Sequence, residues 1–483
     1  MSRRFGEFVV FLSSASVLVI EIVAGRMLAP YVGVTLETFT GIIGVILAGI
    51  AWGAWLGGRL ADSRDPTGVI GPALAVGGVA AALSPSIIDI VGRSVGTDPI
   101  SIVFAAGTAF LVPAIALSTV GPLVVKASLT SLDETGATVG RFSAIGTVGA
   151  IAGTFLAGFV LLRIFGTRQI AFGVGVLLVA VGVAVMVRAS GWRSGIGPTA
   201  ALLAVTGLAG VVTSPCEFET EYVCLAVIVD DERPTGREIW SDIYRISYVD
   251  VEDGSHLEAR YARAMAQVVD GTFAGTVPLS ALYVGGGGFT IPQWLLVTRP
   301  GSTNTVLEID QIMVDVLEDE LAFDANRNGN TTRIGDARLL IADEAADSYD
   351  IVVGDAFSGA TVPWHLTTVE FLDEVRRVLR PDGVYVINVI DYPPLSFVRA
   401  EVASFSMVFP YVGALAPLRY LDGEAGGNFV LVASDAPIAA ASITVLVEDG
   451  SGLIVGGDVL VFTDGAAPLT DNFAPADQLI SRR

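Results

Sequence analysis

Apolar stretches of about 20 residues recur through the first 213 residues of the chain. Each is long enough to cross the roughly 30 Å hydrocarbon core of a bilayer as a helix. The first stretch is not a cleaved signal peptide, because Glu21 and Arg26 interrupt it and further apolar stretches follow. We therefore predict a multi-span α-helical membrane domain over residues 1–213, embedded in a lipid bilayer. About seven spans are expected, at 8–29, 39–60, 69–92, 99–121, 142–165, 167–187 and 196–213.

Basic residues that flank the spans predict which side of the bilayer is cytoplasmic. More of them lie on the side of the N-terminus, so we expect a cytoplasmic N-terminus in a multi-pass protein of the cell membrane. Seven spans place the rest of the chain outside, and six or eight place it inside. The number is open because Pro113 and Pro122 can break a span or make it re-enter. The N-terminal side has Arg3, Arg4, Arg59, Arg64, Lys126, Arg141, Arg188 and Arg193; the other has Arg26, Arg93, Arg163 and Arg168.

The balance of charge changes at residue 214. Residues 1–213 contain 12 Lys and Arg against 9 Asp and Glu, whereas residues 214–483 contain 16 against 41. Such an acidic second half excludes a nucleic-acid partner, which would need basic patches. The acid is dispersed along the sequence, which favours a solubilising surface over a site for a polycation. Cys216 and Cys224 form either a disulfide or two inert thiols, and with two His and no CxxC pair we expect no metal site.

The second half divides into two predicted parts. Residues 214–275 alternate in the manner of strands, which predicts a small β-hairpin layer. In residues 276–483, short apolar runs alternate with helical stretches, which predicts a parallel, doubly wound α/β sheet. The helix in LTTVEFLDEVRRVLRPDGV is expected to begin with a capping box of Thr367 and Glu370 and to end before Pro381.

Four of the expected strands end in residues that suit a nucleoside. Four consecutive glycines beginning at Gly285 follow the first strand, where a ligand can approach the backbone closely. Thr290 replaces the third glycine of a complete G-x-G-x-x-G, and a tight structural turn is the alternative. Glu308 ends the second strand, 23 residues after Gly285, where a carboxylate can accept both hydroxyls of a ribose. Asp336 and Asp355 end the third and fourth strands, so we predict a nucleoside site at this edge.

The order YVGGGG, VLEID, IGDAR, YDIVVGDAFSG and VPWHLTTVEFLDEVRRVLRPDGVYVINV resembles the spermidine synthase family of aminopropyltransferases. The segments EIVAGRMLAPYVG, GIAWGAWLGGRLAD and PLTDNFAPADQL resemble its membrane-fused branch. The resemblance implies a Rossmann-like, methyltransferase-type domain of polyamine biosynthesis. Such a domain takes S-adenosylmethionine or its decarboxylated form as co-substrate and a small-molecule amine as acceptor.

The resemblance also implies a role for each matching residue. Asp355 is implied to be catalytic, because a carboxylate there can orient the attacking amine and accept its proton. The nucleoside-binding residues it implies are Gly285, Gly286 and Gly287 along the nucleoside, Glu308 at the ribose, and Asp336 with Ala337 at the adenine.

Three motifs depart from the family pattern. Gly288 and Phe289 stand where relatives have Asp-Gly, and Ser358 replaces a second Asp three residues after the catalytic one. The hairpin motif D-G-x-x-Q reads DIYRI, with Asp242 kept and Ile246 in place of Gln. Asp242 remains a candidate substrate-binding residue, together with Tyr248 on the same hairpin. The acids that would bind a diamine are depleted, so the acceptor stays open.

Two other functions are compatible with the sequence. A methyltransferase would use the same nucleoside site with S-adenosylmethionine. A transporter or membrane scaffold with a non-catalytic nucleoside-binding domain is motivated by Glu21, whose alternative is a structural pair with Arg59, Lys126 or another span residue. His365 is interpreted as a loop residue hydrogen-bonded beside the following helix rather than a catalytic base, and His256 as a surface residue. Association into a homo-oligomer is left open.

Overall fold

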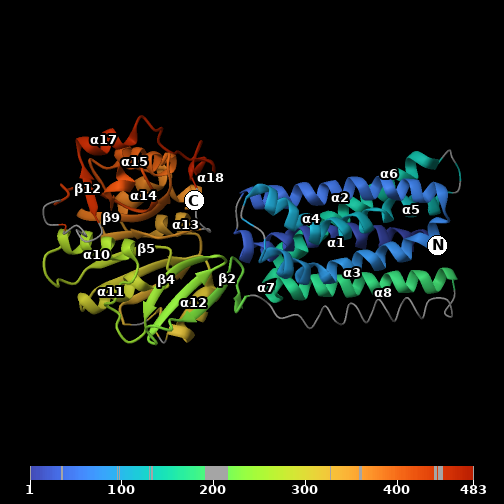
Figure 1. Cartoon of the computed structure of the whole chain (residues 1–483), viewed down its shortest axis with the longest axis horizontal. Helices are drawn as coiled ribbons and strands as arrows, with labels where there is room; N and C mark the ends of the chain where they lie inside the picture. Colours follow the sequence, from blue (N-terminus) through green and yellow to red (C-terminus); the bar gives the residue numbers. More distant parts are fainter. Residues whose placement is uncertain are drawn as a thin grey trace. The chain divides into compact units, whose positions relative to one another are not determined.

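The structure, a computed structural model, describes residues 2–33, 36–94, 96, 98–129, 131, 134–190, 216–321, 323–326, 328–357, 362–439, 443 and 450–481. The chain forms two compact units, Met1–Cys224 and Leu225–Arg483, which Figure 1 colours from blue to green and from green to red. The predicted seventh span, 196–213, lies outside the described residues. The domain boundaries at 214 and 276 stay predictions.

Among the described residues of the first unit, six segments are long and apolar enough to span a membrane, judged by length and composition. Helices α4 and α5 continue one another over Pro99–Ser128, past Pro113, and α6, the π-helical η2 and α7 do so over Thr135–Ile164. The other four are the single helices α1, α2, α3 and α8. The bounds are α1 (Arg3–Val32), α2 (Leu36–Ser63), α3 (Pro66–Gly92), α4 (Pro99–Ser118), α5 (Val120–Ser128), α6 (Thr135–Leu156), η2 (Ala157–Leu161), α7 (Leu162–Ile164) and α8 (Thr167–Ser190).

Small residues bring the helices of this unit close together. Gly49, Gly53 and Gly57 recur every fourth residue of α2, and a Cβ on Gly53 would lie 2.4 Å from a carbonyl oxygen of α4. Helices α3 and α8 meet in the same way, because a Cβ on Gly182 would lie 2.7 Å from the Gly71 carbonyl oxygen. Such close approach is typical of helices that pack inside a bilayer, where van der Waals contact replaces the hydrophobic effect.

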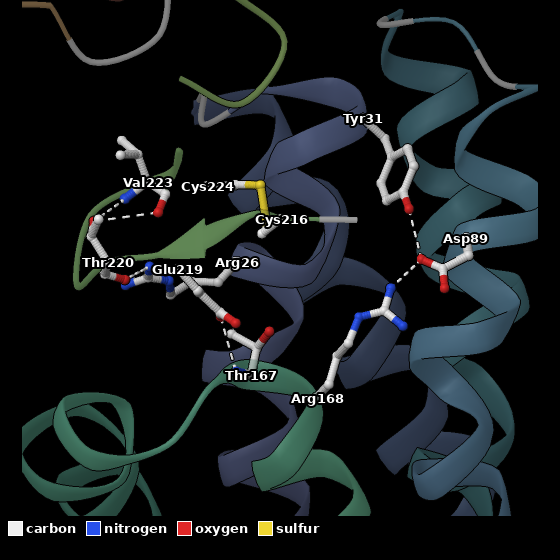
Figure 2. The surroundings of a disulfide bond; sticks show 10 residues. All are labelled: Arg26, Tyr31, Asp89, Thr167, Arg168, Cys216, Glu219, Thr220, Val223 and Cys224. Carbon is white, nitrogen blue, oxygen red and sulfur yellow. Dashed lines mark hydrogen bonds and ion pairs between the residues drawn. A yellow bond between two sulfur atoms is a disulfide. The ribbon is translucent and has the colours of Figure 1, made fainter. Parts of the chain in front are cut away.

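The loop that follows this helical bundle is closed by a disulfide. Cys216 and Cys224 are bonded, which decides between the two alternatives that the sequence left open (Figure 2). Arg26 of α1 donates to two carbonyl oxygens of the loop. The Glu219 carboxylate accepts from the Thr167 N–H at the start of α8, at 2.9 Å. The loop is therefore tied to two helices as well as to itself.

Glu21 does not pair with Arg59 or Lys126, two of the partners that the sequence offered for it. Lys126 pairs with Asp62 at 3.0 Å, and the guanidinium of Arg59 lies 4.6 Å from the centre of the Trp55 ring. Among the residues that the structure describes, Glu21 forms no ion pair.

The second unit begins with the antiparallel strands β2 (Cys224–Val229), β3 (Gly236–Ser241) and β4 (Tyr244–Asp250), as predicted; the short β1 (Phe218–Glu219) precedes them in the first unit. Leu225 pairs with Ser241, and Gly236 with Asp250. Asp242 turns the chain between β3 and β4 with φ 54°, a left-handed conformation that Asp tolerates better than most residues. Helix α10 (Arg260–Thr272) connects this layer to the large sheet.

The large sheet has eight strands in the order β12-β10-β11-β9-β8-β5-β6-β7. Strands β5 (Ser280–Val284), β6 (Thr303–Glu308), β7 (Asn330–Ile334), β8 (Tyr349–Gly354) and β9 (Leu379–Asp391) are parallel, as predicted. The remaining strands β10 (Tyr411–Pro417), β11 (Gly427–Ser434) and β12 (Ser451–Val455) add an antiparallel end, so the prediction of a parallel sheet is wrong for this part. The helices are α11 (Thr290–Thr298), α12 (Gln311–Leu321), α13 (Ala337–Leu340), α14 (Val369–Val378), α15 (Ser396–Val408), α16 (Leu418–Leu421), α17 (Gly457–Thr463) and α18 (Ala476–Leu479), with 3-10 turns η3 (Ile341–Asp343) and η4 (Trp364–Leu366).

The expected capping box of α14 is wrong by one residue. Thr368, not Thr367, is the N-cap, and its hydroxyl accepts from the Phe371 N–H. Glu370 instead accepts from the Asp471 N–H at 2.9 Å. The helix ends at Val378. Phe371 is fully buried, as the helical spacing of the apolar residues in α14 predicts. The position of the N-cap could not be predicted in this way.

Candidate active site

The candidate site lies where the strand order reverses between β5 and β8. The Asp355 N–H donates to the Val284 carbonyl oxygen at 3.0 Å, so the loops after the two strands run side by side. A Cβ on Gly285, whose φ is 91°, would lie 2.9 Å from the Asp355 carbonyl oxygen. Ligands of open α/β sheets bind at this kind of reversal, beyond the carboxyl ends of the strands. Gly285 and Asp355 are thus brought together at the position that the topology favours.

Three of the four glycines differ in what surrounds them. A Cβ on Gly288 would lie 2.6 Å from the Ser247 hydroxyl oxygen of the hairpin layer, so packing within the protein requires that glycine. Gly287 has φ 49°, and a Cβ built on it would meet no atom within 4 Å. Packing against the protein therefore explains Gly285 and Gly288, while Gly287 lies beside open space that a ligand can occupy.

Glu308 is fixed by the backbone of the glycine loop. Its Oε2 accepts from the Gly286 N–H at 2.8 Å, and its Oε1 accepts from the N–H groups of Ile309 and Asp310 at 2.8 and 3.0 Å. The side chain is buried, and burial raises the pKa of its carboxyl while these backbone hydrogen bonds oppose the rise. The carboxylate is therefore already oriented beside the loop, as a ribose-binding group needs to be.

Asp336 and Ala337 begin α13 at the end of β7. Asp336 is the N-cap and accepts from the Arg338 N–H at 2.9 Å. His365 Nε2 lies 3.4 Å from Asp336 Oδ1. His365 thus lies against the predicted adenine-binding carboxylate at the start of α13 and not, as expected, against the start of the helix that follows it.

Asp355 receives two side-chain hydrogen bonds. Asn388 Nδ2 donates to its Oδ1 at 3.1 Å, and the Tyr261 hydroxyl donates to its Oδ2 at 3.2 Å. Asn428 Nδ2 donates in turn to Asn388 Oδ1 at 2.9 Å. Burial raises the pKa of Asp355 to about 6, and the two hydrogen bonds oppose that rise. Asp355 is therefore an oriented carboxylate that titrates close to neutral pH.

Sequence reasoning missed the residues that hold Asp355. Tyr261 lies in the first turn of α10, and Asn388 and Asn428 lie on the neighbouring strands β9 and β11. One signal was present: Asn388 interrupts the apolar run VYVINVI, and a polar residue within a buried strand needs a partner. Nothing in the local sequence marks Tyr261, which meets a residue 94 positions away.

No family model matches the chain. It is 35% identical over 136 residues to the polyamine aminopropyltransferase of Vibrio vulnificus, covering 27% of this chain and 44% of the relative. It is 34% identical over 109 residues to a probable polyamine aminopropyl transferase of Bifidobacterium longum, covering 23% and 24%. The α/β unit is spermidine synthase-like. The chain spans less than half the length of these two curated relatives.

Two further likenesses accompany these. A probable spermidine synthase of Corynebacterium glutamicum, a solved structure, is 27% identical with a TM-score of 0.49, over 54% of this chain and 97% of that one. The human eEF1A lysine and N-terminal methyltransferase is 28% identical over 159 residues, which cover 31% of this chain and 22% of the relative.

The structure also locates two of the departures from the spermidine synthase pattern. Phe289 is fully buried, with its ring 4.7 Å from that of Phe323, so it contributes no polar group to the site. Ile246 contributes its carbonyl oxygen, which accepts from the Tyr261 hydroxyl at 3.3 Å. The third departure, Ser358, lies outside the described residues.

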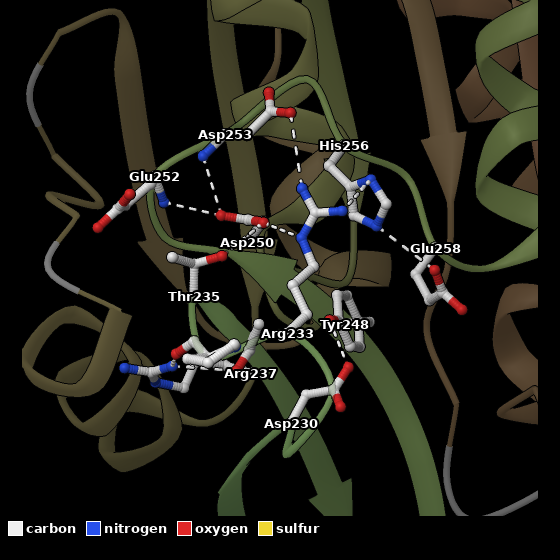
Figure 3. Close-up of polar contacts among 12 residues, drawn as sticks. Asp230, Arg233, Thr235, Arg237, Tyr248, Asp250, Glu252, Asp253, His256 and Glu258 are labelled. Carbon is white, nitrogen blue, oxygen red and sulfur yellow. Dashed lines mark hydrogen bonds and ion pairs between the residues drawn. The ribbon is translucent and has the colours of Figure 1, made fainter.

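Tyr248, the candidate substrate-binding tyrosine, contacts Asp230 and His256. Its hydroxyl donates to Asp230 at 2.7 Å, and its ring lies edge-on to His256 with centroids 5.9 Å apart (Figure 3). His256, expected at the surface, is half-buried there. The tyrosine that reaches Asp355 is Tyr261. Asp242 lies in the β3–β4 turn, and its role in substrate binding stays a prediction.

The polar cluster around Tyr248 is centred on Asp250. This buried carboxylate accepts from Arg233, from the Thr235 hydroxyl, and from the N–H groups of Glu252 and Asp253 (Figure 3). Burial alone would raise the pKa of Asp250, but these hydrogen bonds hold it at about 2. The cluster fixes the end of β4 and the loop beyond it. Among the described residues, no group of three His, Cys, Asp or Glu is placed to hold a metal ion.

Proposed function

We propose that the chain is a membrane-bound transferase that moves an aminopropyl group from decarboxylated S-adenosylmethionine to an amine. The observation that carries the proposal is Asp355, an oriented carboxylate with a pKa of about 6, held at the strand reversal beside the glycine loop. The curated polyamine aminopropyltransferases support the same reaction. The six long apolar segments of the first unit support a location in the membrane.

The donor would occupy the side of the site formed by β5, β6 and β7. Gly285, Gly286 and Gly287 would line its nucleoside, Glu308 would hold the ribose, and Asp336 with Ala337 would hold the adenine. Two features of the structure fit that group: the open space beside Gly287 and the buried carboxylate of Glu308 next to it.

The reaction needs a base and an oriented acceptor. The acceptor nitrogen attacks the aminopropyl carbon bonded to the sulfonium, the C–N bond forms, and the C–S bond breaks with its electron pair staying on sulfur. The products are methylthioadenosine and an aminopropylated amine, whose extra proton passes to Asp355. At pH 7.5 a group with a pKa of about 6 is mostly ionised and can accept this proton. Tyr261 and Asn388 each engage one oxygen, which fixes the carboxylate for that task.

Product analysis tests the proposal. Detergent-purified full chain is given decarboxylated S-adenosylmethionine or S-adenosylmethionine, each with a mixture of primary amines and amino acids, and the products are identified by mass spectrometry. We expect methylthioadenosine and an aminopropylated acceptor from the decarboxylated donor. Both should be lost in Asp355→Asn and retained in Asp382→Asn, a matched change at an exposed position.

Other products would point to the alternatives. Adenosylhomocysteine from S-adenosylmethionine would identify a methyltransferase, an outcome motivated by the likeness to the human methyltransferase. An unchanged donor that nonetheless binds would favour a transporter or scaffold with a nucleoside-binding α/β unit.

A further inference from the structure

A cavity of about 570 Å³ lies in the second unit, on the acceptor side of Asp355. Its lining includes Tyr261 and Asn428. Tyr261 donates directly to Asp355, and Asn428 reaches it through Asn388. A molecule in this cavity therefore contacts the groups that orient the proton acceptor. The walls come from the start of α10, the turn after β9, strands β10 and β11, and α16.

The charged groups of this cavity are unusual for an acidic unit. Among the described residues that line it, the ionised ones are Arg260, Arg419 and Glu424, so cations outnumber carboxylates there, although residues 214–483 contain 41 acids against 16 bases. Among the residues that the structure describes, Arg419 forms no ion pair; its guanidinium lies 5.3 Å from the centre of the Tyr420 ring. Tyrosine hydroxyls and the Asn428 amide supply most of the other polar groups.

These groups suit a diamine less well than an acceptor with a carboxylate, because Glu424, the one carboxylate among the described lining residues, stands beside two guanidinium groups. A diamine places one nitrogen at Asp355 and carries a second ammonium, which needs a carboxylate partner and is repelled by guanidinium groups. A guanidinium instead matches a carboxylate, to which it donates two parallel hydrogen bonds. Among the described lining residues, one Glu and two Arg give a net charge of about +1, which fits a singly charged carboxylate better than a dianionic phosphate.

We propose that this cavity takes an acceptor that carries a carboxylate as well as its primary amine, with the amine toward Asp355 and the carboxylate at Arg419. An amino acid with a side-chain amine satisfies the same lining, because Glu424 can receive its α-ammonium. This inference rests on the proposed function and narrows its acceptor from amines in general to amino carboxylates.

A matched pair of acceptors tests the inference. 5-Aminopentanoate and cadaverine have the same chain length and differ in whether the far end is a carboxylate or an ammonium. With decarboxylated S-adenosylmethionine and the full chain, we expect kcat/KM at least about tenfold higher for 5-aminopentanoate, the size of effect that one charge-assisted pair provides.

Variants at Arg419 locate the effect. Arg419→Gln should raise KM for 5-aminopentanoate about tenfold and leave kcat nearly unchanged, because it removes the contact to the far end only. Arg419→Glu should move the preference toward cadaverine. Arg376→Gln is the control, since Arg376 pairs with Asp435 on the surface and does not line the cavity.

Binding is measured separately so that the two proposals fail in different ways. Calorimetry with methylthioadenosine present should show that 5-aminopentanoate binds and that Arg419→Gln weakens it. Turnover of cadaverine with no use or binding of 5-aminopentanoate would overturn the inference and leave the proposed function standing. No methylthioadenosine from any acceptor would overturn the proposed function, and the calorimetry would still decide whether the cavity binds a carboxylate.

Discussion

The two sides of the strand reversal differ in how their groups are held. On the proposed donor side, Glu308 ends β6 and Asp336 lies two residues beyond β7, and both are fixed by backbone N–H groups within two residues or by the adjacent glycine loop. On the acceptor side, Asp355 is held by Tyr261 and Asn388, which come from distant segments. The residues proposed for the donor match the pattern expected from the sequence, whereas the departures from that pattern lie among the residues expected to meet the acceptor.

The difference has a physical reason. A residue at the end of a strand is positioned by the sheet itself, so the donor site changes only if the fold changes. The acceptor site is assembled from α10, β9, β11 and α16, each of which can alter one side chain without disturbing the sheet. The acceptor side can therefore change while the proposed donor side stays the same, and the variants below are chosen to separate the two sides.

Glu308→Gln is expected to give the largest difference between its effect on donor binding and its effect on acceptor binding. The change keeps the shape of the side chain but removes the charge that the ribose hydroxyls would meet, so the donor and methylthioadenosine should bind about 10- to 100-fold more weakly. The KM of the acceptor should stay within about twofold, because Glu308 does not line the acceptor cavity.

Calorimetry with methylthioadenosine and steady-state kinetics measure the two effects. Glu318→Gln on α12 is a control for removal of one Glu in the same unit, and circular dichroism checks that each variant is folded. If Glu308→Gln weakened donor binding and acceptor binding equally, the two sides of the site would not be separable.

The second prediction concerns pH. Asp355 must be ionised to accept a proton, and its pKa is about 6, so kcat/KM for the donor at saturating acceptor should fall about tenfold per pH unit below pH 6. Above pH 7 the carboxylate is almost fully ionised, and its titration no longer limits the rate. A profile measured from pH 4.5 to 8.5 checks this, and an acid limb centred near pH 4 would show that burial does not control Asp355 during turnover.

The strand-end residues could be predicted from sequence because each lies next to a recognisable apolar run. Tyr261 and Asn388 could not, because their roles depend on contacts across 94 and 33 residues. Strand β10, which reads YVGALAP, was missed since Gly, Ala and Pro obscure its strand pattern. The cap of α14 was misplaced because Thr367 and Thr368 are equally good cap residues, and only packing chooses between them.

The third prediction sharpens the acceptor side alone. Asn388 donates a hydrogen bond that stabilises the ionised form of Asp355, so Asn388→Ala should raise the pKa of Asp355 and move the acid limb to higher pH. Asn428→Ala removes a group one hydrogen bond further away and should move the limb less. Methylthioadenosine affinity should change in neither variant. If the acid limb of the pH profile moves equally in both variants, the pKa of Asp355 responds to the volume of the cavity rather than to the hydrogen bond from Asn388.

Removal of the disulfide is expected to have the smallest effect on donor affinity and on acceptor preference. Breaking the Cys216–Cys224 bond with Cys216→Ser should lower the stability of the first unit by about 2–4 kcal/mol, because the loop gains freedom in the unfolded chain. Donor affinity and the acceptor preference should stay within about twofold. Thermal unfolding in detergent and the paired-acceptor assay measure the two quantities.

The double variant with Cys224→Ser is the control, since either change removes the same bond and both should unfold alike. A changed acceptor preference in both variants would show that the helical unit acts on the site, and the separation between donor and acceptor sides would then not be complete within the α/β unit.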